Sequence, residues 1–189
     1  MKKIAVFASG TGSNAVNLAN YFSAKGDAEV VLLVSNNSDA PVLEKMAHLG
    51  IATEALTKEQ FEDVAYMLSL LSKYDISFII LAGFLKMIPE YLVAAYEKRI
   101  INIHPALLPK YGGKGMYGMR VHEAVVAAGD SVSGITIHYV NPHYDEGEII
   151  FQATCSVFPD DTPKDVAEKV HELEYKHFPE VVEKILASL

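Results

Sequence analysis

Hydrophobic residues along this chain of 189 residues fall into short unbroken runs, separated by stretches in which apolar residues recur at helical spacing. Unbroken apolar runs of about four to eight residues are typical of strands buried on both faces, whereas spacing at i, i+3 and i+4 is typical of amphipathic helices. The runs predict strands at residues 4–8, 30–34, 51–55 and 78–82, and one that ends at His104. The stretches between them predict helices at about residues 15–24, 42–49 and 58–74.

The last third of the chain has a different pattern. Residues 134–140 and 148–157 predict two strands joined by a polar segment. A capping box at Thr162–Asp165, with proline at the first helical position, predicts a long helix that reaches about Leu186. The whole pattern predicts an α/β fold: a Rossmann-like, doubly wound, mostly parallel sheet with helices on both faces, a C-terminal strand pair and a long final helix.

Three segments that follow predicted strands contain polar residues or glycine. They are Ser9–Asn14, the turn at Gly83, and the strand end that carries Asn102 and His104. Ligands of open parallel sheets bind outside the carboxyl ends of the strands. We therefore expect these three segments to share one crevice.

The Ser9–Asn14 segment, Ser-Gly-Thr-Gly-Ser-Asn, lies between a predicted strand and a predicted helix. Glycines there let backbone N–H groups approach an anion, and the start of the helix adds partial positive charge. The segment lacks the Gly-Lys-Ser/Thr of a nucleoside-triphosphate loop. A dinucleotide site would need an acidic residue after the second strand, where Asn36–Ser38 stand instead, with Asp39 just beyond. A lone phosphate is the preferred ligand, and a tight turn without a ligand is the alternative.

The strand that ends at His104 carries two kinds of side chain. Because side chains alternate along a strand, Asn102 and His104 share one face, while Ile101 and Ile103 share the other. An amide can donate hydrogen bonds to a developing oxyanion, and an imidazole can move a proton near neutral pH. The pair suits a reaction at a carbonyl carbon. The alternative is a histidine satisfied by a backbone carbonyl beside an asparagine in a turn.

Composition narrows the classes of partner. The net charge of −8 and the pI of about 5.3 argue against a surface that coats nucleic acid. The single Cys155 excludes an internal disulfide and fits a reducing compartment. No apolar run is long enough to span a membrane, and the run after Lys2–Lys3 is too short for a signal peptide. We expect a soluble cytoplasmic protein without nucleic-acid or membrane partners.

The polar segment Asn141–Gly147 contains Asp145, which on its own is more typical of a solvated loop carboxylate. His138, His143 and Asp145 could in principle bind a metal, but their spacing matches no recognised ligand pattern. We therefore expect no metal site.

Three motifs together resemble the folate-dependent formyltransferase family. They are Asn-Ile-His-Pro-Ala-Leu-Leu-Pro-Lys-Tyr at Asn102–Tyr111, Gly-Ile-Thr-Ile-His at Gly134–His138, and Asp-Glu-Gly at Asp145–Gly147. The resemblance extends from Ile4 to near Pro179. Its central Asn-x-His-Pro motif is specific for formyl transfer from 10-formyltetrahydrofolate, but members with different acceptors share it.

The resemblance also implies a set of site residues. The catalytic residues would be Asn102, His104 and Asp145. The residues that bind the substrate phosphate would be Gly12, Ser13 and Asn14, with Thr11 and Glu174 as further acceptor contacts. The folate-binding residues would be Leu85, Lys86, Met87, Ile88, His138 and Tyr144. Lys86 replaces the usual arginine, and residues 110–120 are more glycine-rich and basic than in many relatives.

The implied reaction is direct attack of an acceptor amine on the formyl carbon, through a tetrahedral intermediate that Asn102 and a protonated His104 stabilise. The resemblance is greatest to members that formylate glycinamide ribonucleotide in de novo purine biosynthesis. Another amine, or water as in deformylases, is the alternative acceptor. We expect one domain over residues 1–189, as a monomer or homodimer, with a phosphate-binding half at about 1–100 and a catalytic and folate-binding half at about 101–189.

Overall fold

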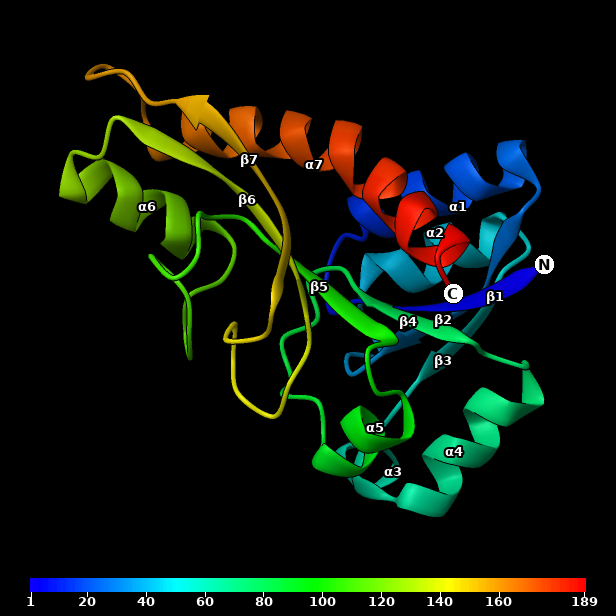
Figure 1. Cartoon of the computed structure of the whole chain (residues 1–189). Helices are drawn as coiled ribbons and strands as arrows, with labels where there is room; N and C mark the ends of the chain where they lie inside the picture. The colour runs from blue at the N-terminus through cyan, green and yellow to red at the C-terminus, as the bar shows by residue number, and fades with distance from the viewer.

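A computed structural model describes all residues, 1–189, and contains one sheet of seven strands in the order β3-β2-β1-β4-β5-β6-β7 (Figure 1). The five parallel strands are β1 (Lys2–Phe7), β2 (Ala28–Ser35), β3 (Ala52–Ala55), β4 (Phe78–Leu81) and β5 (Ile100–His104). The two antiparallel strands are β6 (Val132–Tyr139) and β7 (Ile149–Ser156). The predicted parallel sheet with a C-terminal strand pair is confirmed.

Helices cover both faces of the sheet. The helices are α1 (Ser13–Lys25), α2 (Pro41–His48), α3 (Lys58–Glu62), α4 (Val64–Lys73), α5 (Glu90–Ala95), α6 (Met119–Ala128) and α7 (Pro163–Ala187). In Figure 1, α1, α2 and α7 lie on one face, and α3, α4 and α5 lie on the other. None of the helices combines the length and the apolar composition needed to cross a membrane.

The strands supply a separate core on each face. Along β1, Ile4 and Val6 belong to the core beneath α1, α2 and α7, whereas Ala5 and Phe7 belong to the core beneath α3, α4 and α5. All four side chains are fully buried. Burial on both faces explains why this strand is an unbroken apolar run rather than an alternating one.

The predicted helix at residues 58–74 is wrong in one respect, because the chain forms two helices that meet at Asp63. The Asp63 backbone is extended, with φ −77° and ψ 108°, and its carboxylate accepts a hydrogen bond from the Tyr66 amide at 2.9 Å. The short polar side chain thus caps α4 instead of continuing α3. Helix α6 was also missing from the predicted elements, because its inward face includes His122 between Val121 and Val125 and so breaks the apolar stripe.

The long final helix begins as predicted. Thr162 accepts a hydrogen bond from the Asp165 amide, and the Asp165 carboxylate accepts one from the Thr162 amide at 2.8 Å. Further along, α7 packs on α1, where Asn17 Nδ2 donates to the Tyr175 carbonyl at 2.9 Å. Helix α7 thereby extends from the β6–β7 pair to the first helix of the chain, as Figure 1 shows.

The capping role of Asp63 yields a stability prediction. We expect Asp63→Ala to lower the free energy of unfolding by about 1 kcal/mol, because one amide at the start of α4 loses its acceptor. Urea denaturation followed by circular dichroism measures this loss. The neighbouring Glu62→Ala removes only an exposed i,i+4 pair with Lys58 and should cost less than about 0.5 kcal/mol. Equal losses in the two variants would contradict the capping role.

Candidate active site

The loop between β1 and α1 presents free backbone donors. The amides of Gly12, Ser13 and Asn14 donate to no other backbone group, and they lie at the start of the 13-residue α1. Gly12 has φ +71°, and a Cβ added there would lie 2.0 Å from Val42 Cγ2. Only glycine fits this turn against α2, and unpaired amides at the start of a helix are a favourable environment for an anion.

Neighbouring elements hold this loop in place. Lys45 Nζ donates to the Thr11 carbonyl at 2.8 Å, and the Val42 amide donates to the Gly10 carbonyl at 3.2 Å. Ser9 Oγ accepts a hydrogen bond from the Leu85 amide at 2.9 Å and donates to the Asn36 side chain. The segments that follow β1, β2 and β4 are thus joined at the carboxyl ends of the strands.

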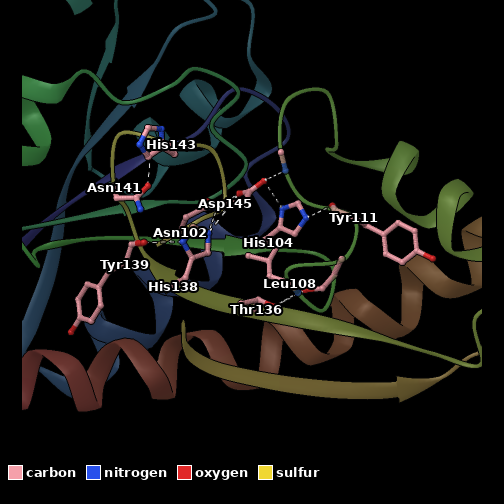
Figure 2. A network of polar contacts seen from close by, with 12 residues as sticks. Asn102, His104, Leu108, Tyr111, Thr136, His138, Tyr139, Asn141, His143 and Asp145 are labelled. Carbon is pink, nitrogen blue, oxygen red and sulfur yellow. Dashed lines mark hydrogen bonds and ion pairs between the residues drawn. The ribbon is translucent and has the colours of Figure 1, made fainter. Parts of the chain in front are cut away.

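Asn102, His104 and Asp145 lie together at the neighbouring end of β5 (Figure 2). His104 Nδ1 is 3.6 Å from Asp145 Oδ2, and Asn102 Nδ2 is 3.4 Å from Asp145 Oδ1. The two β5 residues point to the same side, as strand alternation predicts. The aspartate comes from the loop after β6, so the chain brings it to β5 by a long-range approach.

The protonation of His104 is defined by its neighbours. His104 Nε2 lies 2.7 Å from the Tyr111 carbonyl oxygen, which can only accept, so Nε2 carries a proton and Nδ1 is the nitrogen that titrates. Burial lowers the pKa of His104, and the Asp145 carboxylate and the Tyr111 carbonyl offset this only in part. Burial therefore favours the neutral imidazole, in contrast to the protonated one expected from the sequence.

His138 lies behind Asn102 and orients its amide. His138 Nδ1 donates to the Tyr139 carbonyl at 2.9 Å, so its Nε2 is left to accept from Asn102 Nδ2 at 3.1 Å. The second N–H of Asn102 points to Asp145 across the longer 3.4 Å contact. An oxygen atom of a bound ligand can replace this weak contact by accepting a hydrogen bond from Asn102. His138 itself is 2% exposed and uses both ring nitrogens within the protein.

The Asp145 carboxylate is held by the glycine-rich segment after Tyr111. The Gly113 amide donates to Asp145 Oδ2 at 2.9 Å, and a Cβ added at Gly112 would lie 2.6 Å from Leu108 Cδ2. Burial alone would raise the pKa of Asp145, but His138, His104 and the Gly113 amide together hold it below its usual range. Sequence reasoning missed this contact, because a backbone donor leaves no residue-type signal.

Glu174 links the start of α1 to His171. Its carboxylate accepts from Asn14 Nδ2 at 3.0 Å and lies 3.3 Å from His171 Nδ1. The hydrogen bond with Glu174 raises the pKa of His171. His122, on α6, is buried with Nδ1 unpaired, and burial lowers its pKa against a partial offset from Glu174. The predicted residues did not include His122.

The model of the family described as "Formyl transferase" matches residues 2–182. The chain belongs to the formyl transferase family. It is 44% identical over 187 residues to the chloroplastic phosphoribosylglycinamide formyltransferase of Arabidopsis thaliana, and the match covers 96% of this chain and 64% of that protein. The match to the enzyme of that name from Vigna unguiculata covers 61% of the relative, so the chain spans less than two thirds of both chloroplastic proteins.

Bacterial relatives are matched over nearly their whole length. The phosphoribosylglycinamide formyltransferase of Bacillus subtilis is 35% identical, with 98% of this chain and 95% of the relative covered. The crystal structure of the phosphoribosylglycinamide formyltransferase of Streptococcus pneumoniae superimposes with a TM-score of 0.86 at 38% identity, with 98% of this chain and 99% of that chain covered. The fold of the formyl transferase family therefore extends over the whole of this chain.

The residues that the family resemblance assigns to folate fall into two groups. Leu85, Lys86 and Met87 follow β4, the neighbour of β5, and are exposed, Leu85 to 47% and Met87 to 51%; Tyr144 is also exposed. Ile88 and His138 are buried, Ile88 in the core beneath α5. Only the first group offers apolar side chains to a ligand. No group of three or more His, Cys, Asp or Glu side chains is arranged to hold a metal ion.

The histidine environments yield a titration prediction. We expect the pKa values of His104 and His122 to lie below that of a free imidazole, because burial disfavours their charged forms, and that of His171 to lie above it. Imidazole Cε1–H signals followed by NMR from roughly pH 5 to pH 8 measure all three. A pKa of His122 above that of His171 would contradict the assignment.

The same shifts make the fold less stable in mild acid. The unfolded chain takes up protons on these imidazoles near pH 6.5, whereas the folded chain resists protonation of His104 and His122, so the free energy of unfolding falls as the pH drops below about 6.5. His171, whose pKa is raised in the folded chain, instead stabilises the fold as the pH drops. His122→Gln should make the fall shallower in urea denaturation, and an unchanged slope would count against the buried imidazole.

Proposed function

We propose that this formyl transferase moves the formyl group of 10-formyltetrahydrofolate to the amine of glycinamide ribonucleotide, a step of de novo purine biosynthesis. The observation that carries the proposal is the convergence of Asn102 and His104 on Asp145, at 3.4 Å and 3.6 Å, beside a loop of free amides at the carboxyl ends of the strands. The names of the relatives support the choice of acceptor. Both substrates are small molecules.

The acceptor is held at its phosphate end. The amides of Gly12, Ser13 and Asn14 donate to the phosphate oxygens, and no catalysis is required of them. The Asn14 side chain holds the Glu174 carboxylate at 3.0 Å, so the acceptor contact made by Glu174 is fixed relative to the phosphate. Thr11 acts through its backbone: Lys45 Nζ binds the Thr11 carbonyl and so keeps the loop in its conformation. Remote binding energy is thereby converted into alignment of the amine.

The acceptor amine then attacks the formyl carbon, and negative charge develops on the formyl oxygen. The Asn102 N–H that makes only a 3.4 Å contact with Asp145 donates a hydrogen bond to this oxyanion. Its other N–H stays on His138, which keeps the amide plane in place. One preorganised donor of this kind is worth about 10²–10³ in rate.

Proton transfer is assigned to His104. Its neutral Nδ1 accepts the proton that the attacking amine loses, and Asp145 at 3.6 Å stabilises the imidazolium that results. The imidazolium returns the proton to N10 as the bond from carbon to N10 breaks, so the folate leaves as a neutral amine. Positioned proton transfer contributes roughly 10²–10⁴ in rate. No metal enters this scheme.

The folate is assigned to the exposed apolar side chains beside β5. Leu85, Lys86 and Met87 follow β4, whose Leu81 pairs with Asn102, and Tyr144 precedes the catalytic Asp145. Ile88 and His138 support this surface from beneath rather than touching the pterin.

The decisive experiment is an assay of purified protein for 10-formyltetrahydrofolate consumption, with and without glycinamide ribonucleotide. We expect consumption only with the acceptor, together with formation of formylglycinamide ribonucleotide. Equal consumption in water alone would identify a deformylase instead and would overturn the proposed acceptor.

We expect His104→Ala and Asp145→Asn each to lower kcat by at least about 10²-fold, because each removes a member of the proton path. Their folded state, measured by circular dichroism, should persist. The matched exposed changes His48→Ala and Asp160→Asn should leave kcat within about twofold, as surface substitutions usually do. Near-normal turnover in His104→Ala or Asp145→Asn would refute the assignment.

We expect Asn14→Ala to raise the KM for glycinamide ribonucleotide by about tenfold, since it releases Glu174 from a charge-assisted hydrogen bond. The KM for the folate should change little. Asn20→Ala, an exposed change on the same helix, is the control. A rise confined to the KM for the folate would place the acceptor at the wrong end of the crevice.

A further inference from the structure

We propose that Tyr111, fastened through its hydroxyl to Asp130, is a positioning residue that fixes the ring of His104. This proposal rests on the proposed function, which assigns the chemistry to His104. The Tyr111 carbonyl oxygen lies 2.7 Å from His104 Nε2, and the Tyr111 hydroxyl donates to Asp130 Oδ2 at 2.8 Å. Figure 2 shows the carbonyl turned toward the imidazole and the phenol ring turned away from it.

Asp130 is a fixed anchor. It lies directly after the C-terminal Gly129 cap of α6 and two residues before β6, and its amide donates to the Val125 carbonyl at 3.3 Å. Its carboxylate also binds Lys110 Nζ at 3.0 Å. The hydroxyl of Tyr111 therefore ties the loop after β5 to the junction between α6 and β6.

The loop needs such a tie because its backbone does not hold this shape unaided. Tyr111 has φ +56°, in the left-handed region that a bulky L residue disfavours. Gly112 and Gly113 follow it, and Gly113 has φ +93°. Glycines add freedom rather than stiffness. The bond from the Tyr111 hydroxyl to Asp130 therefore adds to the contacts that fix the direction of the Tyr111 carbonyl.

The same segment touches both members of the proton path. The Tyr111 carbonyl holds His104, and the Gly113 amide, two residues on, donates to Asp145 at 2.9 Å. A shift of Tyr111 thus alters the separation of His104 Nδ1 and Asp145 Oδ2, now 3.6 Å. Such a shift also moves the imidazole relative to the reacting amine, and a misplacement of about 1 Å can cost about 10²-fold in rate.

The role of the hydroxyl is separable from packing. The Tyr111 ring packs against the core beneath α1, α2 and α7, so Tyr111→Phe keeps the ring contacts and loses only the bond to Asp130. Other charged or titratable groups also face His104, one from each neighbouring element: Asp145 from the loop after β6, His138 from β6, His122 from α6 and Glu174 from α7. All of them stay unchanged in this variant.

We expect Tyr111→Phe to lower kcat about three- to tenfold, the range that corresponds to one net hydrogen bond, with KM for both substrates within about twofold. The pKa of His104, followed by NMR, should fall, because the Tyr111 carbonyl raises it in the wild type. The kinetic pKa of His104 should move to lower pH by the same amount. Tyr91→Phe, which removes a hydroxyl bonded to the Phe61 carbonyl and not to Asp130, is the matched control.

Asp130 supplies a second, independent test. Asp130→Asn keeps an oxygen that accepts from the Tyr111 hydroxyl and should retain kcat and the His104 titration, whereas Asp130→Ala should reproduce the Tyr111→Phe values. An unchanged His104 titration in both Tyr111→Phe and Asp130→Ala would overturn the positioning role. The NMR titration of His104 does not depend on turnover. A failure of the proposed reaction would appear in the activity assay, whereas a failure of the positioning role of Tyr111 would appear in the NMR spectra.

Discussion

The site is organised around one buried charge, the carboxylate of Asp145, whose side chain is 12% exposed. A buried carboxylate is costly unless hydrogen bonds and opposite charge surround it. Here the Gly113 amide donates a hydrogen bond at 2.9 Å, Asn102 Nδ2 lies 3.4 Å away, and the imidazoles of His104 and His138 lie 3.6 Å away. These groups come from β5, from β6 and from the loop after β5, so satisfying one carboxylate requires three segments of the chain to meet.

That requirement explains several residues that have no chemistry of their own. Gly112 leaves room for Asp145, since a Cβ there would come within 3.3 Å of its Cβ. Gly147 lets the loop after β6 return against the strand, because a Cβ there would lie 1.6 Å from the Tyr139 carbonyl oxygen. The glycines at both positions permit the close backbone approach that brings the carboxylate to His104.

The sequence predicted the features that depend on local periodicity. Alternation on β5 placed Asn102 and His104 on one face, and the turn chemistry after β1 placed free amides at the start of α1. Asp145 could not be placed from local pattern, because it meets β5 only through the tertiary fold; its assignment came from the family resemblance. For His104 the structure shows the backbone-carbonyl contact that the alternative interpretation named, and the second ring nitrogen faces Asp145.

The remaining misses share a physical cause. The break at Asp63 and the helix α6 were hidden because a capping side chain and a buried histidine interrupt the apolar spacing on which helix prediction depends.

His122 is buried where the charge of Glu174 acts on it, and Glu174 in turn is held by Asn14 at the start of α1. The loop after β1 and the imidazole on β5 are therefore linked through one carboxylate on α7, whose charge also acts to raise the pKa of His104. Because α7 packs on α1 and on the β6–β7 pair, the loop after β1 and the cluster of Asn102, His104 and Asp145 keep a fixed separation.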